Sequence, residues 1–156
     1  MLLRGRQGTE LGLTLVGYQF PDELVDPWES NTLLVEVRLL APEGSWDVVD
    51  PCLTTWETAQ VTRWLAAFAS RADLVANRAL GVQAPNVTLG GQAIAGEPDR
   101  VAIRACFALE LRPPWLRGGT NLCVDVDVDR PQLATAARHL QADLARFPQR
   151  GDDPTL

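Results

Sequence analysis

Hydrophobic and polar residues alternate along several short stretches in the first third of the chain. In residues 31–40 the odd positions from Leu33 onward are apolar, whereas Glu36 and Arg38 are charged. This period of two predicts a strand with one buried face and one solvent-exposed face. Two further stretches with strand character are residues 11–16 and 45–51.

Two later segments carry apolar residues at helical spacing, and each has a recognisable start. Thr54 and Glu57 form the sequence of a capping box, and Asp129 followed by Pro131 is typical of a helix N-terminus. We expect the first helix to reach the low seventies and Pro148 to end the second. The predicted apolar faces are Val61, Trp64, Leu65, Phe68 and Ala69 in the first helix, and Leu133, Ala137, Leu140, Leu144 and Phe147 in the second.

The second half of the chain repeats the change from strand pattern to helix pattern. Residues 100–112 alternate between apolar and polar side chains and predict the longest strand, which Pro113 should end. Residues 122–128 predict the last strand. Between the first helix and these strands, residues 81–99 are rich in Gly, Pro, Asn and Gln, so we expect a mobile loop with a short extended piece at 86–89.

These elements together predict an α+β fold, with a mainly antiparallel sheet and two amphipathic helices. The strand pattern leads into a helix in both halves, which suggests a duplicated βββα unit. The length of 156 residues is that of one ordinary domain. We place this domain at residues 1–148 and expect a flexible C-terminal tail at 149–156.

Composition and charge then narrow the function. Apolar residues make up 46% of the chain, and the net charge is −6, which opposes direct binding to nucleic acid. No stretch is long and apolar enough for a transmembrane helix or a signal peptide, so we expect a cytoplasmic protein without membrane attachment. The three cysteines show no metal-binding spacing and predict buried free thiols. They are Cys52, Cys106 and Cys123.

Three carboxylates at alternate positions are the strongest candidate for chemistry. Asp125, Asp127 and Asp129 share one strand face, but they are too far apart for one metal ion, and Arg130 occupies the glycine position of a calcium loop. We therefore predict the solvated outer face of a strand, with a protein-binding surface as the functional alternative. A sugar hydrolase using paired carboxylates is a third possibility.

The remaining candidates favour binding over catalysis. His139 is the only histidine and has no nucleophile motif to complete, so we predict no catalytic residues, no metal and no cofactor. Trp28 and Trp115 lie in loops between strands, where each is either folded back onto the domain or presented to a partner. We expect the folded-back arrangement.

Four segments in order carry a family resemblance: DPWESNTLLVEVRL, SWDVVDPCLTTWETAQVTRWLAAFA, FALELR and VDVDVDRPQLATAARHLQADLARFP. They resemble the WapI-type immunity proteins and their uncharacterised bacterial relatives. The resemblance implies a small cytoplasmic protein that neutralises the C-terminal nuclease domain of a bacterial toxin by occlusion. It implies a protein partner and carries over no catalytic residues.

Our main hypothesis is therefore a non-enzymatic acidic binding protein whose partner is a basic toxin domain. The alternatives are a housekeeping interaction module that uses Trp28 and Trp115, and the sugar hydrolase. The sequence leaves the oligomeric state and the interface open. The candidate partner-binding residues are Asp125, Asp127, Trp28, Trp115, Asp22, Glu23, Asp26 and Glu29.

Overall fold

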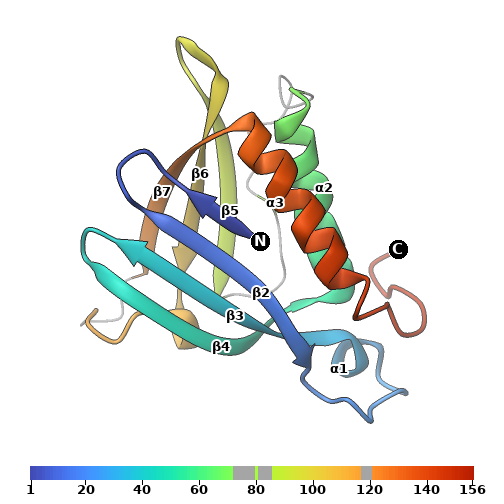
Figure 1. The fold of residues 1–156 in the computed structure, drawn as a ribbon. Helices are drawn as coiled ribbons and strands as arrows, with labels where there is room; N and C mark the ends of the chain where they lie inside the picture. Colours follow the sequence, from blue (N-terminus) through green and yellow to red (C-terminus); the bar gives the residue numbers. More distant parts are fainter. Residues whose placement is uncertain (72–79, 81–85, 117–120) are drawn as a thin grey trace.

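The computed structural model describes residues 1–71, 80, 86–116 and 121–156 (Figure 1). Short loops form three of the six connections between successive strands, and each longer helix directly follows a strand. In chain order the elements are β1 Leu2–Arg4, β2 Glu10–Tyr18, α1 Pro27–Asn31, β3 Thr32–Ala41, β4 Gly44–Thr54, α2 Thr55–Ala69, β5 Val87–Ile94, β6 Glu97–Phe107, the 3-10 helix η2 Leu109–Leu111, β7 Leu122–Asp129 and α3 Arg130–Leu144.

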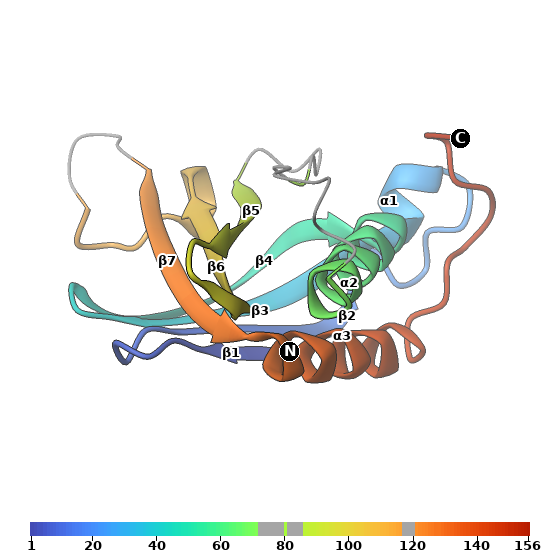
Figure 2. The same cartoon turned by 90° about the horizontal axis from the view of Figure 1, so that it is seen from above.

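The strands form two antiparallel sheets, with orders β1-β2-β3-β4 and β5-β6-β7. The two sheets cross each other. Helices α2 and α3 pack side by side on the side of the domain where the two sheets diverge (Figures 1 and 2). The α+β class is confirmed, with the strands divided between two sheets. When the short helices α1 and η2 are left out, the orders β2-β3-β4-α2 and β5-β6-β7-α3 match the repeat that the sequence suggested.

The inward faces of both sheets and the helix stripes share one apolar core. In β3 the odd residues from Leu33 to Leu39 are buried, as alternation predicted. Each fully buried aliphatic side chain stabilises the fold by about 1.5–3 kcal/mol. The predicted helix residues with 5% exposure or less are Val61, Leu65 and Phe68 on α2, and Leu133, Ala137 and Leu140 on α3.

Both predicted helix starts are confirmed. The Thr54 hydroxyl accepts from the Glu57 amide at 3.2 Å, and a Glu57 carboxylate oxygen accepts from the Thr54 amide at 2.8 Å. The Asp129 carboxylate accepts from the Gln132 amide at 2.7 Å. These bonds satisfy amide groups that a helix cannot pair internally.

The short extended piece expected at 86–89 is confirmed for residues 87–89, which begin β5. The mobile loop expected around it is wrong for residues 90–99, which continue the β5–β6 hairpin. Glycine was taken as a loop signal, but Gly91 lies inside β5. A Cβ atom there would lie 2.6 Å from the Phe68 ring and 3.0 Å from the Trp64 ring. The glycine therefore lets α2 approach the strand closely. Residues 81–85 lie outside the described residues.

The strand expected at 100–112 ends earlier, at Phe107. Leu109 adopts a positive φ of 49° and is 58% exposed, so it leaves the buried face that alternation assigned to it. The chain continues as η2, which buries Leu111. Helix α2 ends at Ala69, and the expected extension beyond Arg71 lies outside the described residues. Neither β1 nor α1 was anticipated.

Candidate partner-binding surfaces

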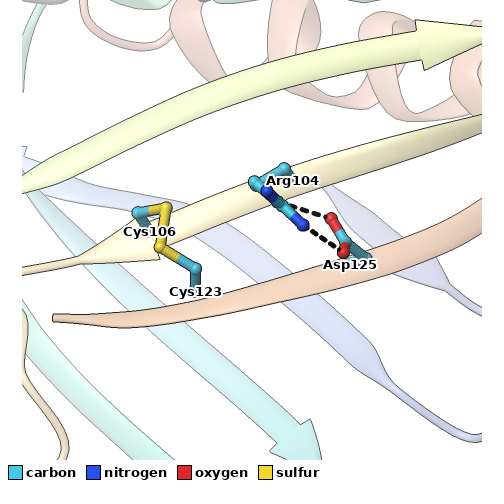
Figure 3. Close-up of a disulfide and its surroundings, with 4 residues drawn as sticks. All are labelled: Arg104, Cys106, Cys123 and Asp125. Carbon is cyan, nitrogen blue, oxygen red and sulfur yellow. Dashed lines mark hydrogen bonds and ion pairs between the residues drawn. A yellow bond between two sulfur atoms is a disulfide. The ribbon is translucent and has the colours of Figure 1, made fainter.

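The outer face of the second sheet carries the aspartates that the sequence singled out. Asp125 stands directly opposite Arg104 in the β6–β7 register (Figure 3). The two carboxylate oxygens accept from the Arg104 guanidinium at 2.9 Å and 2.7 Å, which is a bidentate pair. This hydrogen bonding outweighs partial burial and lowers the pKa of Asp125.

Asp127 lies in a larger ion-pair network on the same face. Its carboxylate accepts from Arg100 at 2.7 Å and from Arg6 at 2.6 Å, and Arg6 also donates to Glu97 at 2.8 Å. Burial alone would raise the pKa of Asp127, but the bonds from Arg100 and Arg6 prevail and lower it. Arginines thus offset these carboxylates, so the stripe presents little net negative charge.

The expectation of three buried free thiols is wrong for two of them. Cys106 and Cys123 stand opposite each other in the β6–β7 register and form a disulfide on the outer face (Figure 3). Their 17-residue separation in sequence did not reveal this, because strand register decides which residues meet. Cys52 is the free, buried thiol that was expected.

The acidic loop, defined as residues 20–29, comprises most of the connection from β2 to α1 and the start of α1, and it projects from the lower end of the domain in Figure 1. Its own carboxylates organise its backbone. Glu23 accepts from the amides of Val25 and Asp26, at 2.6 Å and 3.1 Å, and these bonds lower the pKa of Glu23. Asp26 accepts from the Trp28 and Glu29 amides and caps α1.

The C-terminal segment holds this loop from behind. The Arg150 guanidinium stacks on the Tyr18 ring, 3.5 Å from its centroid, and donates to the carbonyl oxygens of Phe20 and Glu23. The buried Asn31 side chain accepts from the Arg150 amide at 2.8 Å and donates to its carbonyl at 2.7 Å. The domain boundary at 148 stays a prediction, and these contacts attach Arg150 to the domain.

The acidic loop differs from the strand face in its charge. It contains Asp22, Glu23, Asp26 and Glu29 and no basic residue. Within the described parts of the chain, none of these carboxylates lies within ion-pair distance of an arginine. Five of the eight predicted binding residues, these four carboxylates and Trp28, therefore gather in one projecting segment, and the carboxylates have no ion-pair partner among the described residues.

Trp28 was expected in a loop between strands but lies in α1, and Trp115 lies after η2; both side chains pack against the domain. Trp28 lies edge-on to the buried Trp56, with ring centroids 5.2 Å apart. Trp115 covers Gly44, where an added Cβ would lie 3.3 Å from the Trp115 ring, and it keeps 36% exposure. This is the expected folded-back arrangement, so neither ring is a fully presented anchor.

The sequence reasoning missed the exposed apolar residues of the acidic loop. Leu24 is 71% exposed and Val25 is 91% exposed. Two apolar residues between acidic ones were a visible signal, but a short loop offered no periodicity for interpreting them. The arginines that neutralise the strand face were also missed, because only strand register and the packing of the β1–β2 loop bring them there.

The described residues were also examined for a metal site, for the position of the single histidine and for membrane-spanning helices. No group of three or more His, Cys, Asp or Glu side chains is placed to hold a metal ion across 1–71, 86–116 and 121–156. His139 is exposed on α3, as expected. No helix in the same ranges combines the length and apolar character needed to cross a bilayer.

Comparison with known proteins gives a family for this fold and surface. Searches of curated proteins and of solved structures found no match. The model of the immunity protein WapI-like family matches residues 1–148, which covers nearly the whole chain of 156 residues. The match includes both sheets, the three α-helices and the acidic loop. The chain therefore belongs to the WapI-like family of immunity proteins.

Proposed function

We propose that this protein neutralises the nuclease domain of a bacterial toxin by binding and occluding it. Membership of an immunity family implies a toxin as the protein partner. The observation that supports a nuclease domain as the partner is the acidic loop, since its carboxylates have no arginine partners among the described residues. Nucleases that bind a phosphate backbone tend to be basic, and complementary charge speeds association.

The state of the strand-face aspartates supports binding rather than hydrolysis. A glycosidase needs one carboxylic acid with a raised pKa to protonate the leaving group. Arg104 and the Arg6–Arg100 pair instead lower the pKa values of Asp125 and Asp127, which keeps both ionised at neutral pH. These aspartates therefore stabilise the sheet rather than supply a proton.

The direct test looks for a toxin gene next to the gene of this protein and mixes the protein with the C-terminal domain of that toxin. We expect a one-to-one complex in calorimetry and loss of nuclease activity at equimolar protein. Heat-denatured protein is the control. Full nuclease activity at a tenfold excess of the folded protein would show that the proposed function is wrong.

The cytoplasm is the proposed site of action, because a nuclease threatens the cell from there. The Cys106–Cys123 disulfide makes this part of the proposal testable, since disulfides are rare in reducing compartments. Thiols alkylated at the moment of cell lysis should show Cys106 and Cys123 reduced in a cytoplasmic protein. A fully oxidised pair in that experiment would place the protein in an oxidising compartment.

A further inference from the structure

We infer that Leu24 and Val25 form the apolar anchor by which this protein binds its partner, entering an apolar socket surrounded by basic side chains. The inference rests on the proposed function and names the contact that would slow dissociation of the complex. It starts from exposure. Leu24 is 71% and Val25 is 91% exposed, whereas the other large apolar side chains exposed among the described residues, outside this loop and before the chain terminus, reach at most 58%.

The exposure is held in place by the loop's own bonds. The Gln19 amide donates to the Thr32 carbonyl at 2.8 Å and closes the base of the loop. At the tip, the Glu23 carboxylate binds the Val25 amide, so the backbone beneath the two apolar side chains has a defined path. From behind, Arg150 binds the Phe20 and Glu23 carbonyls. A loop ordered before binding loses less entropy on association.

The surrounding charge limits what can cover the tip. Four carboxylates lie between residues 22 and 29. A second copy of this chain would bring four more against them, and an anionic membrane surface would also be repelled. A basic protein surface with an apolar depression would attract the four carboxylates and bury the two exposed apolar side chains. Anchors of this kind at interface centres carry a large share of binding energy.

The decisive variant is Leu24→Ser with Val25→Ser, which removes the apolar tip and retains all four carboxylates. We expect binding to the adjacent toxin domain to weaken by at least about 30-fold, mainly through faster dissociation. Folding should not change, because both side chains are exposed. Thermal unfolding of the free variant checks this.

The matched control is Leu40→Ser with Val49→Ser, a leucine and a valine that are 46% and 50% exposed on the outer face of the first sheet. Its affinity should stay within about threefold of wild type. If the tip variant binds like wild type, the inference is wrong and the proposed function stands. If the wild-type protein does not bind the toxin domain, both are wrong. Concentration-dependent dimers that the tip variant abolishes would identify a second copy as the occupant and overturn the inference.

Discussion

At the scale of single residues, burial decides what the polar and reactive groups can do. Cys52 is 2% exposed, and burial, with smaller contributions from Asp50 and Glu57, raises its pKa to about 12. Thiolate is the reactive form of cysteine, so Cys52 is both shielded and protonated. Glu57 is also buried, but its carboxylate has a function in the capping box.

Native protein at pH 8 should therefore not react with iodoacetamide at Cys52. Unfolding in guanidinium without reductant should expose one reactive thiol per chain, since the other two cysteines form the disulfide. Mass spectrometry counts the labelled sites, and Cys52→Ala is the control that should stay unlabelled. Labelling of the native protein at the unfolded rate would contradict the burial of Cys52.

Asp127 gives a prediction that depends on pH. Its folded-state pKa is lowered from the ordinary value of 3.8, so its ion pairs stabilise the fold above that pH and are lost as the pH falls through the folded-state value. Asp127→Asn should lower the free energy of unfolding at pH 7. The difference from wild type should shrink below pH 3.8 and disappear once the pH lies well below the folded-state pKa of Asp127.

Urea titrations at several pH values measure this difference. High salt at pH 7 should also reduce it, because the pairs are partly exposed. Asp47→Asn is the control, since Asp47 is exposed and has no ion-pair partner among the described residues. A difference that stays constant down to pH 2 would refute the assigned network.

At the scale of elements, the contact between α2 and β5 depends on a missing side chain. Gly91→Ala would place a methyl group against Phe68 and Trp64, so we expect a loss of about 1–3 kcal/mol of stability. Gly90→Ala is the matched control. A Cβ there would lie 4.0 Å from its nearest neighbour, on Arg104, so the change should be neutral or stabilising. Equal stability of both variants would contradict this packing.

The disulfide between β6 and β7 also links two elements and should contribute to stability. It joins strands that are already paired and closes a loop of 17 residues, which in the chain-entropy estimate stabilises the fold by about 3 kcal/mol. The variant Cys106→Ser with Cys123→Ser should unfold at lower denaturant concentration. Reductant should lower the stability of the wild-type protein and leave the variant unchanged. A wild-type protein that is insensitive to reductant would contradict a stabilising disulfide.

At the scale of the whole molecule, charge is distributed unevenly. Opposite charges alternate on the outer face of β6 and β7, whereas the acidic loop carries four acidic residues and no basic one. The four carboxylates of the acidic loop contribute to the net charge of −6, and their field should attract a basic partner before the two proteins touch. The proposed function then gives different tasks to the carboxylates and to the apolar tip.

Asp22→Asn with Glu29→Gln should slow association with the toxin domain several-fold at low salt, and the difference should vanish at about 1 M salt. Stopped-flow association rates measure it. Glu43→Gln with Asp47→Asn removes the same charge near the far end of β3 and should have a smaller effect. An equal effect of both pairs would mean that net charge, and not the loop, steers association.

Elements whose causes are local could be predicted from the sequence. The alternation of β3, the capping box of Thr54 and Glu57, and the Asp129 cap depend on residues only a few positions apart, and all three were predicted from the residues alone. The middle of the β5–β6 hairpin, residues 90–99, was missed for the opposite reason. Gly91 is explained by helix rings that lie more than twenty residues away in the chain.

Which side chains meet on the surface, in contrast, depends on tertiary packing. Strand register places Arg104 opposite Asp125, where the two form an ion pair, and Cys106 opposite Cys123, where they form a disulfide. The Asn31–Arg150 bonds behind the acidic loop link residues 119 positions apart. Such partners meet because the packing of one common core fixes where distant segments lie, and a local pattern contains no information about that packing. The loop's charge was therefore readable in the sequence, whereas its ordered, projecting apolar tip was not.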